Sequence, residues 1–147
     1  MRLSTQADYA VRAMLELARS GEGVWRRTDE IAAAQRIPPA RLAKVLKELA
    51  RADLVRTQRG QGGGVALARA ADRITVLDAY EAVEGPILLC RCRQRPGECG
   101  DDGECETHGF WSTVEERLRQ ELRSTTFAAL AARRHDGTAG RRQAAGR

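Results

Sequence analysis

The sequence QRGQGGG at residues 58–64 places four glycines within five consecutive positions. Short apolar segments flank this tract at 54–57 and 65–67. Because glycine adopts backbone angles that other residues avoid, the tract predicts a hairpin in which the two segments pair as strands. A purely structural hairpin is one interpretation, and a hairpin whose backbone approaches a phosphate strand is the other. A nucleotide-binding loop is disfavoured, since no Gly-x-x-x-x-Gly-Lys-Ser/Thr pattern is present and the tract opens no helix.

Three helices are predicted before the hairpin. Ser4 is placed to cap the first, in which small and apolar residues recur every three or four positions until Gly21. Thr28 is expected to cap the second, and Pro39 suits the first turn of the third. The predicted buried face of the third helix consists of Leu42, Val45, Leu46 and Leu49.

Two short helices joined by a tight turn, the second rich in cations, are typical of a helix-turn-helix whose second helix enters the major groove of DNA. The helical spacing alone is a weak signal, but a glycine-rich hairpin directly after it strengthens the interpretation by supplying a wing. The predicted DNA contacts are Arg41, Lys44, Lys47, Arg56, Arg59 and Gly62.

The distribution of charge is consistent with this interpretation. The net charge is +5, and residues 1–75 carry 14 Lys and Arg against 8 Asp and Glu. Residues 76–108 reverse the balance, with 3 against 8. A basic first half predicts a polyanionic partner, whereas an acidic second segment predicts a separate task. A solvated surface in an arginine-rich chain is the alternative interpretation of the same charges.

Three further helices are predicted after the wing. Thr75 is placed to cap one that ends at Gly85, a longer one is expected to begin at Thr107, and Thr126 to cap a short last one. The long helix carries an apolar stripe, which predicts a two-fold dimer interface if the helix projects from so small a domain. That stripe consists of Trp111, Val114, Leu118 and Leu122.

All four cysteines fall between residues 90 and 105, and His108 follows them. The N-terminus has no secretion signal, and no apolar segment is long enough to span a membrane, so we expect a cytoplasmic protein. In a reducing cytosol, clustered thiols more often bind metal or do redox work than form disulfides. Residue type alone does not separate iron from zinc, because thiolates and imidazole suit both.

The sequence also resembles a known family. Five segments, MRLSTQADYAVRAMLELA, LVRTQRGQGGGVAL, TVLDAYEAVEG, the spaced cysteines and THGFWSTVEERLRQELRSTTFAAL, are similar in this order to Rrf2 transcriptional regulators of bacteria. The resemblance spans roughly residues 1–130. It implies a mainly α-helical fold, a winged helix-turn-helix with a two-stranded wing and a long dimerisation helix. It also implies DNA contacts from Arg41, Lys44 and Arg59.

The resemblance further implies a cofactor. Family members that bind an iron-sulfur cluster carry three cysteines spaced much like Cys92, Cys99 and Cys105, and those with a histidine at the position of His108 hold a 2Fe-2S cluster. This ligand pattern is closest to that of the family's iron-sulfur-cluster regulators. A 4Fe-4S cluster with Asp8 as fourth ligand, or a structural zinc, is the alternative. Cys90 has no counterpart in the pattern and is interpreted as a spare thiol.

The predicted organisation has four parts. Residues 1–84 form the DNA-binding lobe, 85–108 the cluster-binding loop, 109–132 the dimerisation helix with a closing short helix, and 133–147 a disordered basic tail. The predicted function is that of a cytoplasmic, homodimeric DNA-binding regulator, expected to repress, whose affinity for a palindromic operator follows iron-sulfur, redox or nitric-oxide status. A regulator or protein-binding module with structural zinc is the alternative. We expect no enzymatic activity, because the sequence has no nucleotide fingerprint or catalytic triad candidate.

Overall fold

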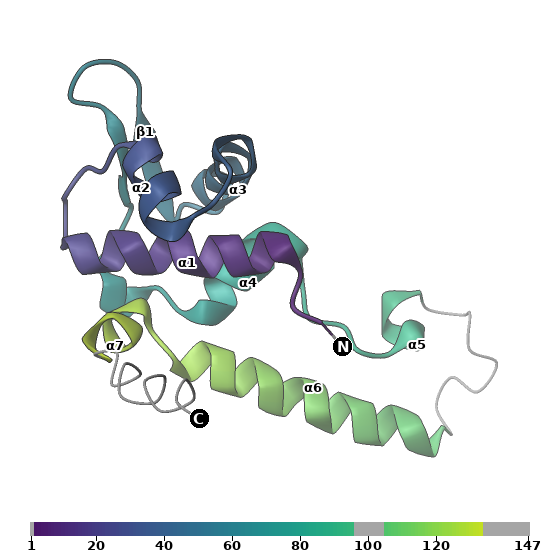
Figure 1. The fold of residues 1–147 in the computed structure, drawn as a ribbon. Helices are drawn as coiled ribbons and strands as arrows, with labels where there is room; N and C mark the ends of the chain where they lie inside the picture. Colours follow the sequence, from purple (N-terminus) through teal and green to yellow (C-terminus); the bar gives the residue numbers. More distant parts are fainter. Residues whose placement is uncertain (1, 96–104, 134–147) are drawn as a thin grey trace, which may run out of the picture.

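The computed structural model describes residues 2–95 and 105–133 (Figure 1). Helices and a single hairpin follow one another along the chain. In order they are α1 (Thr5–Ser20), α2 (Thr28–Gln35), α3 (Pro39–Arg51), β1 (Val55–Gln58), β2 (Gly64–Leu67), the short 3-10 helix η1 (Ala71–Arg73), α4 (Val76–Glu84), α5 (Arg91–Gln94), α6 (Glu106–Ser124) and α7 (Phe127–Ala132). The described part of the chain is therefore mainly helical with a two-stranded sheet, which confirms the predicted fold class.

The first three helices begin and end where local side chains satisfy the backbone. Ser4 Oγ accepts a hydrogen bond from the N–H of Ala7 (3.0 Å), and Gly21 ends α1 at a positive φ of 99°. Pro39 stands in the first turn of α3, as predicted. Thr28 does not cap α2 as predicted. It is the first residue of that helix, since the Glu30 side chain accepts from the N–H of Arg27 (3.4 Å), which holds the start of the helix one residue earlier.

The hairpin is antiparallel, and its register pairs Val55 with Leu67 and Gln58 with Gly64. A third, single-residue strand lies at its edge. The N–H of Arg26 donates to the carbonyl of Val65 and the N–H of Val65 donates to the carbonyl of Arg26, both at 2.8 Å. The wing is thus joined to the segment that connects α1 with α2.

The core lies where α1, α3, α4 and the hairpin meet. The predicted stripe of α3 is buried, and α1 contributes a matching face. This arrangement leaves the opposite face of α3 to solvent. The largest buried apolar side chains of the core are Met14 and Leu17 of α1, Ile31 of α2, Leu42 and Leu49 of α3, Phe127 of α7, and Leu54 and Ile74 of the connecting segments.

The C-terminal helices take different places. Helix α6 begins away from the lobe and its C-terminal part reaches the lobe alongside α4, whereas α7 folds back against α1 (Figure 1). Two backbone hydrogen bonds fix this return, from Val76 N–H to the Thr125 carbonyl and from Phe127 N–H to the Ile74 carbonyl, both 2.9 Å. Phe127 then lies fully buried in the core of the lobe.

Two features of the segment before α6 were not predicted. Residues 85–108 were expected to form a loop, but Arg91–Gln94 form the short helix α5. Helix α6 begins at Glu106, one residue before the predicted Thr107, because Cys105 takes the N-cap position. The predicted tail from residue 134 onward and Cys99 lie outside the described residues.

Candidate nucleic-acid interface

The surface of α3 carries the predicted contact residues. Arg41, Lys44 and Lys47 are all exposed, on the side of α3 away from its buried stripe. Arg41 and Lys44 also line a small hollow against the first turns of α1, beside Tyr9. The N-terminal half of α3 and the start of α1 therefore form one continuous surface.

A groove of about 620 Å³ separates α3 from the wing. Three cationic side chains border it, Lys47 and Arg51 from α3 and Arg59 from the wing. The remaining lining residues come from α2, α3 and the hairpin: Thr28, Ala43, Leu46, Ala50, Thr57, Gln58, Gly64 and Val65. A groove with cations on both walls suits a chain of phosphates.

The wing residues themselves are exposed. Arg59 and Gly62 lie at the hairpin tip, and Gly62 has a φ of +78° with open space where a side chain would stand. Glycine is needed there for its backbone conformation rather than for room. At the base of the wing, the guanidinium of Arg56 lies over the Trp25 ring, 5.9 Å from its centroid.

The predicted cationic contacts lack acidic partners. Within the part of the chain that the structure describes, no ion pair is formed by Arg41, Lys44, Lys47, Arg56 or Arg59. Their neighbour Arg51 differs, because its Nη1 lies 3.2 Å from a carboxylate oxygen of Glu48 on the same helix. These five cations, which have no acidic partner in the described structure, keep their full charge available to a polyanion.

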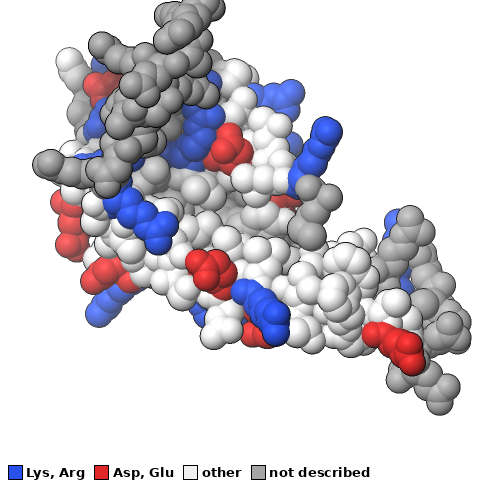
Figure 2. Space-filling view, turned by 60° about the horizontal axis from the view of Figure 1, so that its bottom comes forward, with Lys and Arg blue, Asp and Glu red and all other residues white. Residues whose placement is uncertain are grey.

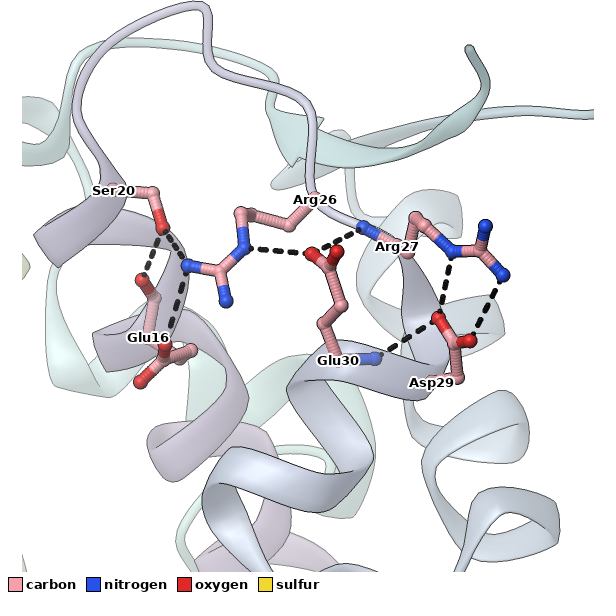
Figure 3. Close-up of polar contacts among 6 residues, drawn as sticks. All are labelled: Glu16, Ser20, Arg26, Arg27, Asp29 and Glu30. Carbon is pink, nitrogen blue, oxygen red and sulfur yellow. Dashed lines mark hydrogen bonds and ion pairs between the residues drawn. The ribbon is translucent and has the colours of Figure 1, made fainter. Parts of the chain in front are cut away.

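A polar network lies behind this surface and joins α1, α2 and the connecting segment (Figure 3). The Arg26 guanidinium is its centre, and Arg27 pairs with Asp29 through two hydrogen bonds of 3.0 and 2.9 Å. The hydrogen bond from Arg27 holds the pKa of Asp29 below its ordinary value, and the same contact raises the pKa of Arg27. Neither Arg26 nor Trp25 was singled out from the sequence, since no local pattern distinguishes them from other surface residues.

The predicted metal ligands are only partly described. Cys105 caps α6 and His108 lies one turn later, with its N–H donating to the Cys105 carbonyl (3.0 Å). Cys92 belongs to α5, and Cys99 lies outside the described residues. Among the residues that the structure describes, no group of three metal-binding side chains comes together. The alternative ligand Asp8 lies on α1, where it pairs with Arg12 at 3.2 Å.

One buried carboxylate in α6 was missed by the sequence analysis. Glu115 is 2% exposed and is the one buried charged side chain of the described residues. Its carboxylate accepts hydrogen bonds from the N–H of Leu89 (3.1 Å) and from Arg93 Nη1 (2.6 Å). Glu115 lies one turn from both Trp111 and Leu118, so an acidic residue beside an apolar stripe was the available signal. It fastens the segment that leads into the cysteines onto α6.

The apolar stripe of α6 is only partly covered. Val114, Leu118 and Leu122 are half-buried, and Trp111 is 41% exposed. Phe110 beside it is 61% exposed, and the two rings stack edge to face at 5.2 Å. Seen from below, the surface that includes α6 is largely uncharged, with charged side chains in a few separate groups (Figure 2). No helix of the described residues is long and apolar enough to cross a bilayer.

The sequence is similar to those of known bacterial transcriptional regulators. Residues 3–133 match the Rrf2 family, described as iron-dependent transcriptional regulators. The chain is 37% identical to the HTH-type transcriptional regulator IscR of Xenorhabdus nematophila over 131 residues, which is 88% of this chain and 79% of IscR. It is also 37% identical to an HTH-type transcriptional regulator of Mycobacterium tuberculosis, over 89% of this chain and 81% of the relative.

Solved structures agree with the sequence comparison. CymR, the global cysteine regulator of B. subtilis, superposes with a TM-score of 0.75 at 29% identity, covering 89% of this chain and 96% of CymR. IscR of T. potens superposes with a TM-score of 0.72 at 27% identity, covering 88% of this chain and 85% of that one. These relatives are transcriptional regulators rather than enzymes. The chain with its winged helix-turn-helix belongs to the Rrf2 family of DNA-binding transcriptional regulators.

Proposed function

We propose that this regulator is a homodimeric repressor whose affinity for its operator is controlled by an iron-sulfur cluster, with 2Fe-2S favoured. The observation that carries the proposal is the placement of α6. Its first turn holds Cys105 and His108, and its last residue leads directly into α7, which is packed in the DNA-binding lobe. One helix therefore links the cysteine segment to the lobe that carries the proposed DNA contacts.

The DNA-binding part of the proposal is supported by the cations without acidic partners. Arg41, Lys44 and Lys47 would follow the major groove from α3, and Arg56 and Arg59 would contact phosphates from the wing. Gly62 would let the wing backbone approach the duplex closely. Two such lobes related by a two-fold axis would require a palindromic operator.

The described ligands fit a cluster. Cys105 and His108 are three residues apart in the first helical turn, where side chains share one face, and the N-terminus of a helix favours a thiolate. Cys92 and Cys99 would complete the set proposed from the sequence. When bound, the cluster would supply a chemically labile group that responds to oxidants or nitric oxide. The Glu115 contacts to Leu89 and Arg93 would hold the segment carrying Cys92 against α6.

The dimer would use the uncovered stripe of α6. Trp111, Val114, Leu118 and Leu122 lie beside the polar face that packs inward through Glu115 and Arg119. Burying an aromatic pair and three aliphatic side chains against a second copy would remove apolar surface from water. A shift of α6 caused by the cluster would then change the spacing of the two lobes.

The experiment uses the full chain purified without oxygen. Visible absorbance, iron and sulfide content are measured first, and a duplex that binds the protein is selected from a random-sequence pool. Affinity for this duplex is then measured before and after removal of the cluster. Cys105→Ala and His108→Ala are expected to lose the cluster and to change affinity, whereas Cys90→Ser is the control that keeps both.

Each alternative has its own outcome. Zinc in place of iron, with colourless protein, would favour the structural zinc site. A brown protein whose affinity is unchanged on cluster removal would show that the cluster does not regulate binding. Loss of selection from the pool under all conditions would contradict DNA binding itself.

A further inference from the structure

Arg26 belongs to two parts of the molecule at once. Its backbone forms the single-residue strand at the edge of the wing, through two hydrogen bonds of 2.8 Å with Val65. Its side chain points away from the wing, toward the helices (Figure 3). Arg26 therefore holds the wing through its backbone and the helices α1 and α2 through its side chain.

The guanidinium of Arg26 contacts both α1 and α2. Nη1 donates to Ser20 Oγ (2.8 Å) and to Glu16 Oε1 (3.3 Å), and Nε donates to Glu30 Oε2 (3.1 Å). The Arg26 side chain is 28% exposed and Glu16 is 15% exposed, so the Arg26–Glu16 contact is better shielded from solvent than most surface pairs, whereas Glu30 is 49% exposed. A planar guanidinium reaches acceptors on two helices in a way that a single ammonium does not.

The acceptors are themselves held in place. Glu16 also accepts from Gln35 Nε2 (2.8 Å) at the end of α2, so its carboxylate spans α1 and α2. On the wing side, a Cβ at Gly64 would collide with the Arg26 carbonyl oxygen. The wing base is therefore packed directly against the Arg26 backbone without room for a side chain between them.

We propose that Arg26 is a positioning residue that fixes the wing relative to α1 and α2, and through their packing relative to α3, so that the wing and α3 contact one stretch of DNA at the same time. The inference rests on the proposed DNA contacts of the wing. Arg26 does not itself bind DNA, because its guanidinium is engaged by three acceptors behind the surface. Its loss would leave the recognition helix intact but would let the wing, with Arg59 at its tip, move independently.

A double-mutant cycle between Arg26 and Arg59 tests this inference in the full-length protein. Affinity for the selected duplex is measured for Arg26→Gln, Arg59→Ala and the double variant over a range of salt concentrations. Arg59→Ala alone should weaken binding about tenfold and reduce the salt slope by about one. In the Arg26→Gln background the same change should cost less than about threefold, because the wing has already lost its contact. Arg26→Gln alone should reduce the salt slope although Arg26 touches no phosphate.

Arg12→Gln is the matched control. Arg12 also joins α1 to α2, through the side chain (3.5 Å) and the carbonyl of Gln35, and pairs with Asp8 within α1 (3.2 Å), but none of its hydrogen bonds in the described structure reaches the wing. Its loss should be additive with Arg59→Ala. If Arg26→Gln is additive as well, Arg26 has only a structural role and the inference is overturned. Thermal unfolding confirms that each variant is folded, and Arg26→Lys replaces Arg26→Gln in the cycle if that variant unfolds.

The result separates this inference from the proposed function. Should the unchanged protein show no salt-dependent DNA binding, the proposed function fails. Should it bind, with Arg59→Ala weakening it as expected but without coupling to Arg26, only the positioning role fails.

Discussion

Two groups of cations in this protein differ in what surrounds them. Five of those on α3 and the wing, Lys44 and Arg59 among them, are exposed and have no acidic partner in the described structure. Those behind that surface are engaged by carboxylates from other elements, as Arg26 is by Glu16 and Glu30. Residue type alone does not distinguish the two groups, since arginine dominates both.

This contrast separates the cations that hold the fold together from those that are proposed to contact DNA. The charge of an arginine that bridges two helices is offset by carboxylates of the same chain, whereas a cation without an acidic partner leaves its charge available to DNA. The net charge therefore overstates how many cations are available to DNA. Four substitutions test this distinction, and they follow in order of decreasing expected effect.

Gly64→Ala should have the largest effect, because it disrupts the packing of the wing against the backbone of Arg26. The new Cβ would collide with the Arg26 carbonyl, and φ is +146°, a conformation that L side chains rarely adopt. We expect a loss of about 3 kcal/mol in the free energy of unfolding, measured by chemical denaturation. Gly62→Ala is the control, since its Cβ meets nothing within 4 Å and only the backbone strain remains. Equal losses in the two variants would contradict the packing described at Arg26.

Glu115→Ala should come second. It leaves the Leu89 N–H without its acceptor and removes the partner of Arg93, which is 44% exposed and regains water. The expected loss is about 2 kcal/mol in the free energy of unfolding, mostly from the partly buried Leu89 N–H. The neighbouring Glu116 is exposed, so Glu116→Ala should change stability by less than about 0.5 kcal/mol. Similar losses at both positions would argue against the buried contact.

Lys44→Ala should leave stability unchanged and weaken DNA binding. One phosphate contact fewer predicts about a tenfold loss in affinity at low salt and a salt slope smaller by about one. Arg51→Ala on the same helix should cost less, since Glu48 already offsets that charge. Fluorescence anisotropy with a labelled duplex at several salt concentrations measures both. A larger loss for Arg51→Ala would remove the distinction between paired and unpaired cations.

Asp29→Asn should have the smallest effect, and in the opposite direction. Asp29 lines the hollow beneath the wing glycines and engages Arg27, so its removal frees a cation near the wing. We expect DNA binding to strengthen by about two- to threefold at low salt and less at high salt. Since Arg27 lowers the pKa of Asp29, that carboxylate stays charged throughout the range from about pH 5 to pH 8, and the gain should not vary with pH. A gain that grows with rising pH would contradict this assignment.

Much of the lobe could be predicted because local chemistry dictates it. Ser4, Thr75 and Thr126 cap their helices as predicted, and the buried stripe of α3 follows directly from its spacing. The hairpin was predictable from its glycines, to within one residue at the start and end of β1 and at the start of β2. In each case the determining groups lie within a few residues of one another.

The remainder depends on contacts between distant segments. Glu115 is buried only because Leu89 and Arg93 reach it from 26 and 22 residues away. Arg26 becomes a junction only when Val65 lies beside it. A single sequence does not show that Glu115 pairs with Leu89 and Arg93 or that Arg26 pairs with Val65. An acidic or basic residue on a helix or loop is ordinarily solvated. The metal ligands stay a prediction, because Cys99 lies outside the described residues.

The return of α7 to the lobe has a consequence for synthesis on the ribosome. Phe127 occupies the core of the DNA-binding lobe, yet it follows the 19 residues of α6 in the chain. A growing chain that has emerged only as far as α4 lacks this side chain and the backbone pairing at Thr125 and Phe127. The DNA-binding lobe thus reaches its final packing only after α6, the helix proposed to link it to the cluster, has been translated. A nascent chain therefore cannot complete the DNA-binding lobe before it contains α6.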